Sequence, residues 1–266
     1  MHILCPIDFS DHSLYALDYA INLGNKLGAR LHLFTAYSVP HSTGRLRSLD
    51  EEIKKSVLED LAEVLERISP KITTGEKPLY SVMEGNSGRV ISEFSKNHDI
   101  DLIVMGTQGK GSISNIFLGS VAKKVADNAT VPVIAVPQPL KTSMDETIVV
   151  LNVDEKVVSN DFSINFVKNF VKKLNLKLDI FHAVSVMVSD DNYKDTISKF
   201  GDLVRDVKIE GSDNITGSIK NNAEKNNYSL IMMIRRPHSF WSRLFMDTHT
   251  TSELAMTRIP IMILPE

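Results

Sequence analysis

The sequence predicts an α/β protein built from two similar halves, each a parallel β-sheet covered by helices on both faces. Short apolar runs alternate along the chain with longer segments whose apolar residues recur at helical spacing. Strands that are apolar throughout, rather than at every second residue, are typical of parallel sheets buried on both faces. In addition, residues 101–138 align without gaps with residues 229–266, which indicates a tandem duplication.

The strands and helices of the first half follow from these two patterns. Strands are expected at residues 3–7, 31–37, 79–83, 102–105 and 133–136. The first helix follows Ser10, a plausible N-cap, and ends near Gly28. Further helices are expected at residues 50–68, 90–94 and 120–128. Each of the first four apolar runs is thus followed by one helical segment.

The second half repeats this order. Strands are expected at residues 148–153, 178–184, 207–210, 230–234 and 259–264. Helices are expected around residues 162–174, 191–203 and 215–224, with one more between the last two strands. Because Pro, Lys, Thr and Ser interrupt the apolar runs between residues 139 and 146, we predict one domain over residues 1–140 and another over 141–266.

Both halves end in an apolar strand that begins at a proline, residues 131–136 and 259–264. An apolar edge strand left open is an aggregation hazard. We therefore expect the two halves to pair these edges with each other as an intramolecular pseudo-dimer. A further homodimer through another face stays open.

Composition excludes several classes of protein. Hydrophobic residues make up 42% of the chain and charged residues 24%, which excludes global disorder. No apolar run reaches the ~18–20 residues of a membrane span, and the first residues lack the pattern of a secretory signal. The net charge of −3 gives no sign of nucleic-acid binding. The single cysteine, Cys5, excludes an intramolecular disulfide. Together these observations predict a cytoplasmic protein.

A glycine-rich segment lies where the fourth strand of the first half ends and a helix begins. Residues 106–112 read GTQGKGS, and Gly119 and Ser120 follow. In doubly wound folds ligands bind at the carboxyl ends of strands, and glycines let amides at a helix N-terminus approach phosphate oxygens. Ser120 adds a hydroxyl and Lys110 a charge. The spacing is neither that of a Walker loop nor that of a dinucleotide motif, so a simple tight turn is an equal alternative.

Several motifs together resemble the universal stress protein family. They are residues 6–10 (PIDFS), residues 101–106 (DLIVMG), the Gly-x2-Gly-x9-Gly-Ser arrangement from Gly106, and residues 131–133 (VPV). The match covers residues 1–138, and the duplicated chain resembles tandem members of the family. The resemblance implies two Rossmann-like domains of the adenine nucleotide alpha hydrolase-like type, each a five-stranded parallel sheet flanked by helices. It also implies an ATP-binding branch, with ADP or AMP as alternatives and Mg²⁺ beside the phosphates, and dimerisation through the last strand.

The resemblance further implies which residues bind the nucleotide. Asp8, flanked by Pro6 and Ile7, matches the aspartate at the adenine and ribose end, and Ala36 matches an adenine-pocket position. The remaining matches are Met105, Gly106, Gly109, Gly119, Ser120 and Val121. An alternative role for Asp8, as a partner of the helix cap at Ser10, stays open. No catalytic residue and no metal-ligating side chain is assigned.

The aligned residues of the second half lack this site. Four positions differ: Ile234 for Gly106, Pro237 for Gly109, Asp247 for Gly119 and Thr248 for Ser120. A branched side chain, a missing amide donor and a negative charge all oppose a phosphate group. Although Asp154 still matches Asp8, we predict one nucleotide site per chain, in the first half.

Two arginines and two aromatic residues occupy the altered loop of the second half: Arg235, Arg236, Trp241 and Phe245. They bind either a different anionic ligand or a protein partner, or the loop packs on the other domain. We favour the packed loop, with the aromatic rings buried and the arginines solvated.

The sequence predicts a nucleotide-binding protein of stress response or signalling, with a protein partner that it does not identify. An efficient enzyme needs a general base, and the loop between Gly106 and Gly119 contains no Asp, Glu or His. Two alternatives remain. One is a slow ATPase, and the other is an interaction scaffold that no longer binds nucleotide.

Overall fold

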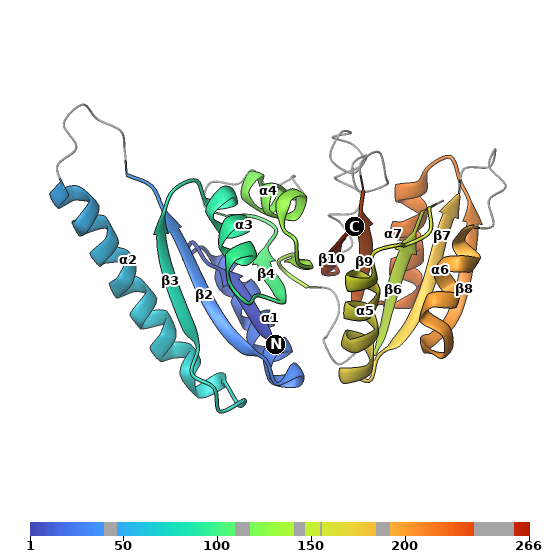
Figure 1. Cartoon of the computed structure of the whole chain (residues 1–266), viewed down its shortest axis with the longest axis horizontal. Coiled ribbons are helices and arrows are strands. Elements are labelled where there is room, and N and C mark those ends of the chain that lie inside the picture. Colours follow the sequence, from blue (N-terminus) through green and yellow to red (C-terminus); the bar gives the residue numbers. More distant parts are fainter. Residues whose placement is uncertain (40–46, 110–117, 141–146, 155, 185–191, 237–257) are drawn as a thin grey trace. The chain divides into compact units, whose positions relative to one another are not determined.

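The computed structural model describes the chain except for residues 40–46, 110–117, 141–146, 155, 185–191 and 237–257. It divides into two compact units, and the division falls inside strand β5 (Val133–Val136): described residues up to Val133 belong to the first unit and those from Ile134 to the second. In each unit strands and helices alternate along the chain (Figure 1). The boundary at residues 140 and 141 and the pairing of the two halves stay predictions.

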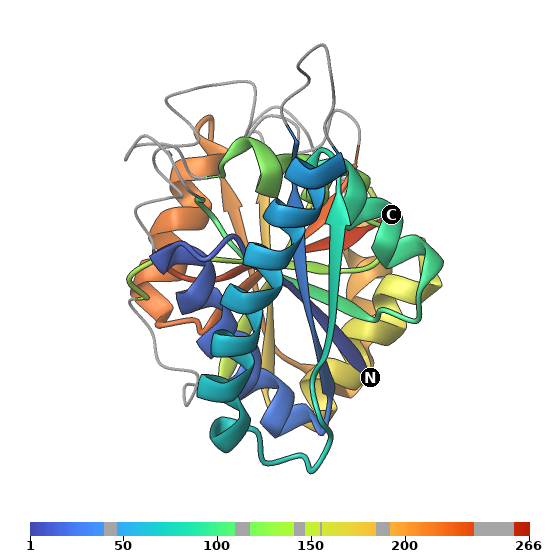
Figure 2. The same ribbon diagram turned by 90° about the vertical axis from the view of Figure 1, so that its left-hand side faces the viewer.

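The first unit is a parallel sheet with helices on both faces, as the sequence predicts. Its strands are β1 (His2–Pro6), β2 (Arg30–Tyr37), β3 (Leu79–Glu84) and β4 (Leu102–Gly106), in the order β3-β2-β1-β4. The amide of Ile103 in β4 donates to the carbonyl of Pro132, directly before β5, at 2.9 Å. The helices are α1 (Asp11–Leu27), α2 (Arg47–Ile68), α3 (Ser87–Asn97) and α4 (Ser120–Asn128), with a 3-10 turn at Ser69–Lys71. Helix α2 packs against β2 and β3 (Figure 2).

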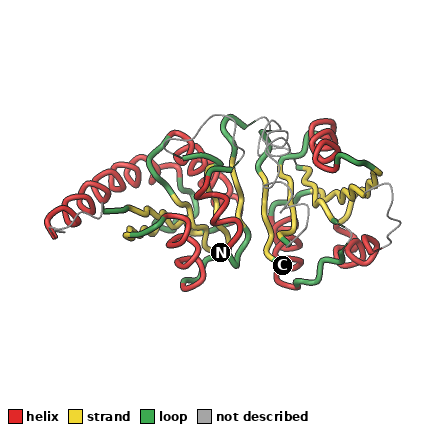
Figure 3. The backbone as a smooth tube through the Cα atoms, turned by 90° about the horizontal axis from the view of Figure 1, so that it is seen from above, coloured by secondary structure: helices red, strands yellow, loops and turns green. Residues whose placement is uncertain are grey.

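The second unit repeats the arrangement with five parallel strands. They are β6 (Ile148–Val153), β7 (Lys177–Val184), β8 (Val204–Gly211), β9 (Leu230–Arg235) and β10 (Ile261–Pro265), in the order β10-β9-β6-β7-β8. Its helices are α5 (Asp161–Lys173), α6 (Asn192–Phe200) and α7 (Ile215–Asn226), with a 3-10 turn at Gly201–Leu203. In each unit helices lie on both sides of the strands (Figure 3). The helix expected between the last two strands falls outside the described residues.

The core consists of the continuous apolar strands. Ile3, Leu4 and Cys5 of β1 and Ile103 of β4 are fully buried, so side chains on both faces of these strands are covered. This confirms the prediction that the apolar runs form strands of a sheet that is buried on both faces. No helix in the part of the chain that the structure describes is long and apolar enough to cross a membrane.

Helix α1 begins and ends where the sequence predicts. The Ser10 side chain accepts a hydrogen bond from the amide of Ser13, which identifies Ser10 as the N-cap. Gly28 lies in the left-handed region at φ 60°, and its amide and that of Ala29 donate to carbonyls of the last turn. The cap places the short connection between β1 and α1 at the carboxyl end of the sheet.

We expect the buried imidazole of His32 in β2 to make the stability of the protein depend on pH. Its Nε2 lies 2.9 Å from the Oγ atom of Ser81. Burial, followed by the charges of His98, His2 and Arg30, lowers the pKa of His32 from 6.5 to about 4. The unfolded chain therefore takes up this proton at a higher pH than the native chain does. The free energy of unfolding should be unaffected by this group above about pH 6.5 and fall by up to about 3 kcal/mol towards pH 4.

Urea unfolding at a series of pH values measures this effect. His32→Gln should remove the corresponding part of the pH dependence while the carboxylate contributions remain. Equal slopes for the variant and the wild type between pH 6.5 and 4 would contradict the assignment to His32.

Candidate functional site

The sheet of the first unit changes its winding direction between β1 and β4. The chain runs from β1 through α1 to β2 on one side, and returns through α3 to β4 on the other side of β1. Ligands of doubly wound folds bind at such a point, beyond the carboxyl ends of the strands. A cavity of about 730 Å³, counted with the space open to solvent at its mouth, lies there.

All ten residues that the resemblance assigns to a nucleotide site line this cavity. They are Pro6, Ile7, Asp8, Ala36, Met105, Gly106, Gly109, Gly119, Ser120 and Val121. They come from the ends of β1, β2 and β4, from the turn after β4 and from the start of α4. The structure thus brings together residues that are more than a hundred positions apart. The role of each in binding stays a prediction.

Seven further residues line the cavity, and the sequence did not point to them: Ser13, Phe34, Ser87, Ile91, Thr107, Gln108 and Ala122. Three of these residues could have been predicted from their positions in the sequence. Phe34 precedes Ala36 by two positions and therefore points to the same face of its strand. Ser87 and Ile91 are four apart at the start of α3, the helix that follows the carboxyl end of β3. Ligands of doubly wound folds bind beyond the carboxyl ends of the strands, and this rule applies to β3 as it does to β4.

Asp8 lies two residues beyond the end of β1 and has two distinct contacts. The amide of Ile7 donates to the carbonyl of Phe34 at 2.9 Å, which extends the pairing of the strand to the residue before Asp8. The Oδ1 atom of Asp8 accepts from the amide of Ser10 at 3.1 Å and from its hydroxyl at 2.5 Å. The alternative role, support of the helix cap, is therefore present in the structure. The other carboxylate oxygen, Oδ2, faces Gly109: a Cβ atom there would lie 2.7 Å from it.

Backbone geometry around Asp8 is unusual. Phe9 has a φ of 61°, a left-handed conformation that bulky residues rarely adopt. Such conformations persist where the surrounding structure enforces them, and they cluster at ligand sites. Opposite, Gly106 lies so close to α1 that a Cβ atom would be 2.9 Å from the carbonyl oxygen of His12. Only glycine fits at that position without displacing the backbone.

The start of α4 supplies hydrogen-bond donors to the cavity. The amide of Gly119 donates to the carbonyl of Thr107 at 2.7 Å, which holds the helix start beside the turn after β4. The first-turn amides of Ser120, Val121 and Ala122 have no acceptor within the helix. All three residues line the cavity, where these amides and the positive end of the helix dipole favour an anion. Lys110 lies outside the described residues.

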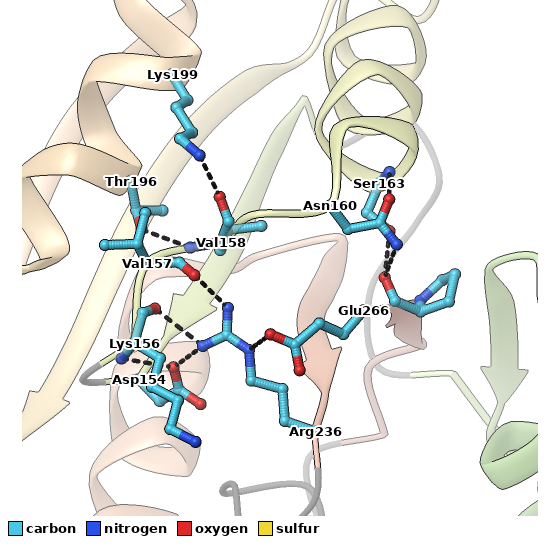
Figure 4. A network of polar contacts seen from close by, with 11 residues as sticks. Asp154, Lys156, Val157, Val158, Asn160, Ser163, Thr196, Lys199, Arg236 and Glu266 are labelled. Carbon is cyan, nitrogen blue, oxygen red and sulfur yellow. Dashed lines mark hydrogen bonds and ion pairs between the residues drawn. The ribbon is translucent and has the colours of Figure 1, made fainter.

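At the corresponding place in the second unit, an arginine pairs with two carboxylates. Arg236, directly after β9, is only 2% exposed and forms ion pairs with Asp154 and Glu266 (Figure 4). The expectation of solvated arginines is therefore wrong for Arg236, because two carboxylates compensate its charge; Arg235 is half-buried. Ile234 is buried at the end of β9. The other altered positions, Pro237, Asp247 and Thr248, and the aromatic residues Trp241 and Phe245 lie outside the described residues.

A parallel α/β sheet with a cavity at its switch point defines a Rossmann-like protein. The sequence model of the universal stress protein family matches residues 1–137, and the chain belongs to that family. A universal stress protein of Methanocaldococcus jannaschii is 35% identical over 141 residues, which are 52% of this chain and 83% of that protein. One of Thermus aquaticus is 34% identical over 135 residues, which are 50% of this chain and 96% of that protein.

A solved structure extends the likeness of fold to both halves. The crystal structure of a universal stress protein from Archaeoglobus fulgidus superimposes with a TM-score of 0.75 at 22% identity. The match covers 99% of this chain and 98% of that one. The present chain therefore has the tandem form of the fold, with two halves of the family's α/β type.

Proposed function

We propose that the first half binds ATP, with ADP or AMP as alternatives, and that the protein acts through this binding in stress response or signalling. The observation that carries the proposal is the convergence on one cavity of a carboxylate, a glycine cradle and the start of a helix. Asp8 suits the adenine or ribose end because its oxygens accept hydrogen bonds from amino and hydroxyl groups. Gly109 and the first amides of α4 suit the phosphates.

The described lining of the cavity fits a nucleotide better than a hydrolytic reaction. Asp8 is its single carboxylate, and it contains no histidine. Mg²⁺ would therefore be held chiefly by the phosphates, because the described lining offers no pair of carboxylates to ligate it. Because Oδ1 of Asp8 already accepts two hydrogen bonds from Ser10, this carboxylate is a poor general base. Slow hydrolysis and a scaffold role stay alternatives, and the cytoplasm stays the expected compartment.

Calorimetric titration with Mg-ATP tests the proposal. We expect one site per chain. Asp8→Asn keeps the size of the side chain but removes the negative charge, and it should weaken binding roughly tenfold, the value of one charge-assisted hydrogen bond. The matched control is Asp11→Asn, the same change at an exposed position in the first turn of α1, which should leave binding unchanged.

Each outcome of this titration decides between named alternatives. No binding in the wild type would overturn the proposal and favour the scaffold. Two sites per chain would overturn the assignment to the first half alone. Equal weakening by both substitutions would show a general effect of charge rather than a contact of Asp8.

A further inference from the structure

Three N–H donors of the Arg236 guanidinium donate hydrogen bonds within the second unit, and its Nε forms an ion pair there. Nε lies 2.6 Å from a carboxylate oxygen of Glu266. Nη1 donates to a carboxylate oxygen of Asp154 and, at 2.9 Å, to the carbonyl of Lys156, and Nη2 donates to the carbonyl of Val157 at 2.7 Å. A guanidinium that is so fully engaged offers little to an anionic ligand. The alternative in which this arginine binds an external anion is therefore not supported.

The location of this group corresponds to the ligand crevice of the first unit. Asp154 follows β6 as Asp8 follows β1, and β6 pairs with β9 in parallel as β1 pairs with β4. In the ungapped alignment of the halves, Arg236 stands opposite Gln108, which lines the cavity of the first unit. The charged group therefore lies between the carboxyl ends of two neighbouring strands, where a doubly wound fold binds its ligand.

Two further differences between the halves accompany the arginine. Glu266 stands opposite Gln138, so a pair of neutral amides is replaced by a cation and an anion. The connection after the first strand is also longer in the second half: residues 154–160 separate β6 from α5, whereas residues 7–10 separate β1 from α1. The longer connection supplies the two carbonyl groups that bind the guanidinium. These three changes are complementary, because a buried cation needs both charge compensation and hydrogen-bond acceptors.

The same connection is also held from its other side (Figure 4). The amide of Val158 donates to the hydroxyl of Thr196 at 3.1 Å, and the ammonium group of Lys199 donates to the carbonyl of Val158 at 2.7 Å. Thr196 and Lys199 belong to α6, and Thr196 is fully buried. Arg236 therefore connects the ends of β6, β9 and β10 with a loop that is itself held by a helix.

We propose that Arg236 is an internal substitute for a ligand: its guanidinium fills the crevice of the second unit, and the place that it occupies is a site for a planar cation. The second unit is then stable without any external ligand and closed to nucleotides. This inference does not depend on nucleotide binding by the first unit, since it concerns other residues and is tested by stability.

Chemical rescue of a truncated side chain tests the proposal. Arg236→Ala should lower the midpoint of thermal unfolding by roughly 10 °C, because Asp154 and Glu266 are left close together without their cation. Methylguanidinium chloride at millimolar concentration should raise the midpoint of this variant in a saturable manner and leave the wild type unchanged. Urea at the same concentrations is planar and of similar shape but uncharged, and it should not rescue.

Two variants serve as controls. Arg89→Ala removes an exposed arginine of α3 that pairs with Glu93, and it should change the midpoint little. The double variant Arg236→Gln with Glu266→Gln copies the two amides of the first half. It should be more stable than Arg236→Gln alone, and it is the variant to measure if Arg236→Ala does not fold.

Three results would overturn the proposal. One is an unchanged midpoint in Arg236→Ala. Another is equal behaviour of methylguanidinium and urea on that variant. The third is a double variant that is no more stable than Arg236→Gln.

Discussion

Gly109→Pro is expected to abolish the binding of Mg-ATP while the chain stays folded. Proline removes the backbone N–H and adds ring atoms where even a Cβ would lie 2.7 Å from Oδ2 of Asp8. Loss of a charge-assisted hydrogen bond, together with displacement of the Asp8 carboxylate, should weaken binding at least about a hundredfold. Calorimetric titration measures the loss, and an unchanged midpoint of thermal unfolding shows that the fold is retained.

Two companion variants separate the causes of this loss. Gly109→Ala keeps the N–H but adds the Cβ atom, so it should bind with intermediate affinity. Pro237→Gly makes the reverse change at the aligned position of the second half, and it should create no second site because Arg236 still occupies the crevice there. If Gly109→Pro binds ATP as the wild type does, the glycine segment is only a turn and the scaffold alternative gains support.

Asp179→Ala is expected to lower the stability of the second unit. Asp179 lies in β7, is 3% exposed, and accepts hydrogen bonds from Nε of Arg205 at 2.7 Å and from the hydroxyl of Tyr228 at 3.0 Å. Burial of Tyr228, with Asp179 beside it, raises the pKa of the phenol, so Tyr228 remains a hydrogen-bond donor at neutral pH. Alanine leaves both donors without this acceptor; because Arg205 is partly exposed and the Tyr228 hydroxyl is buried, the free energy of unfolding should fall by about 1–3 kcal/mol.

Urea unfolding with a matched control measures this loss. Asp206 on β8 is opposite Asp179 in the register of the two strands but is exposed, so Asp206→Ala should change the free energy of unfolding by less than about 0.5 kcal/mol. Similar losses for the two variants would show that the buried hydrogen bonds of Asp179 contribute nothing beyond the negative charge.

The comparison of the halves shows that a duplicated fold can use one position in two ways. Asp8 and Asp154 follow equivalent strands, and each accepts hydrogen bonds at the carboxyl end of a sheet. In the first unit the space beside the carboxylate is a cavity. In the second unit an arginine of the same chain pairs with the carboxylate. We expect ligand occupancy to change the conformation of the first unit alone.

The order of strands and helices, the parallel sheets and ten of the residues that line the cavity could be predicted from the sequence. Apolar runs, helical spacing and caps such as Ser10 and Gly28 act between neighbours in the chain, so they can be read locally. Because parallel strands end at one edge of the sheet, Asp8 and the segment from Gly106 to Ser120 are expected to lie together at that edge.

The partners of Arg236 and Asp179 are visible only in the folded structure. Arg236 contacts Asp154 across 82 positions of the chain, and Asp179 contacts Tyr228 across 49. Charged residues in a sequence favour solvent unless a partner compensates them, and no local pattern reveals a partner so distant. Whether such a side chain is buried or exposed depends on the folded arrangement of several strand ends and loops. The burial of Arg236 could therefore not be predicted.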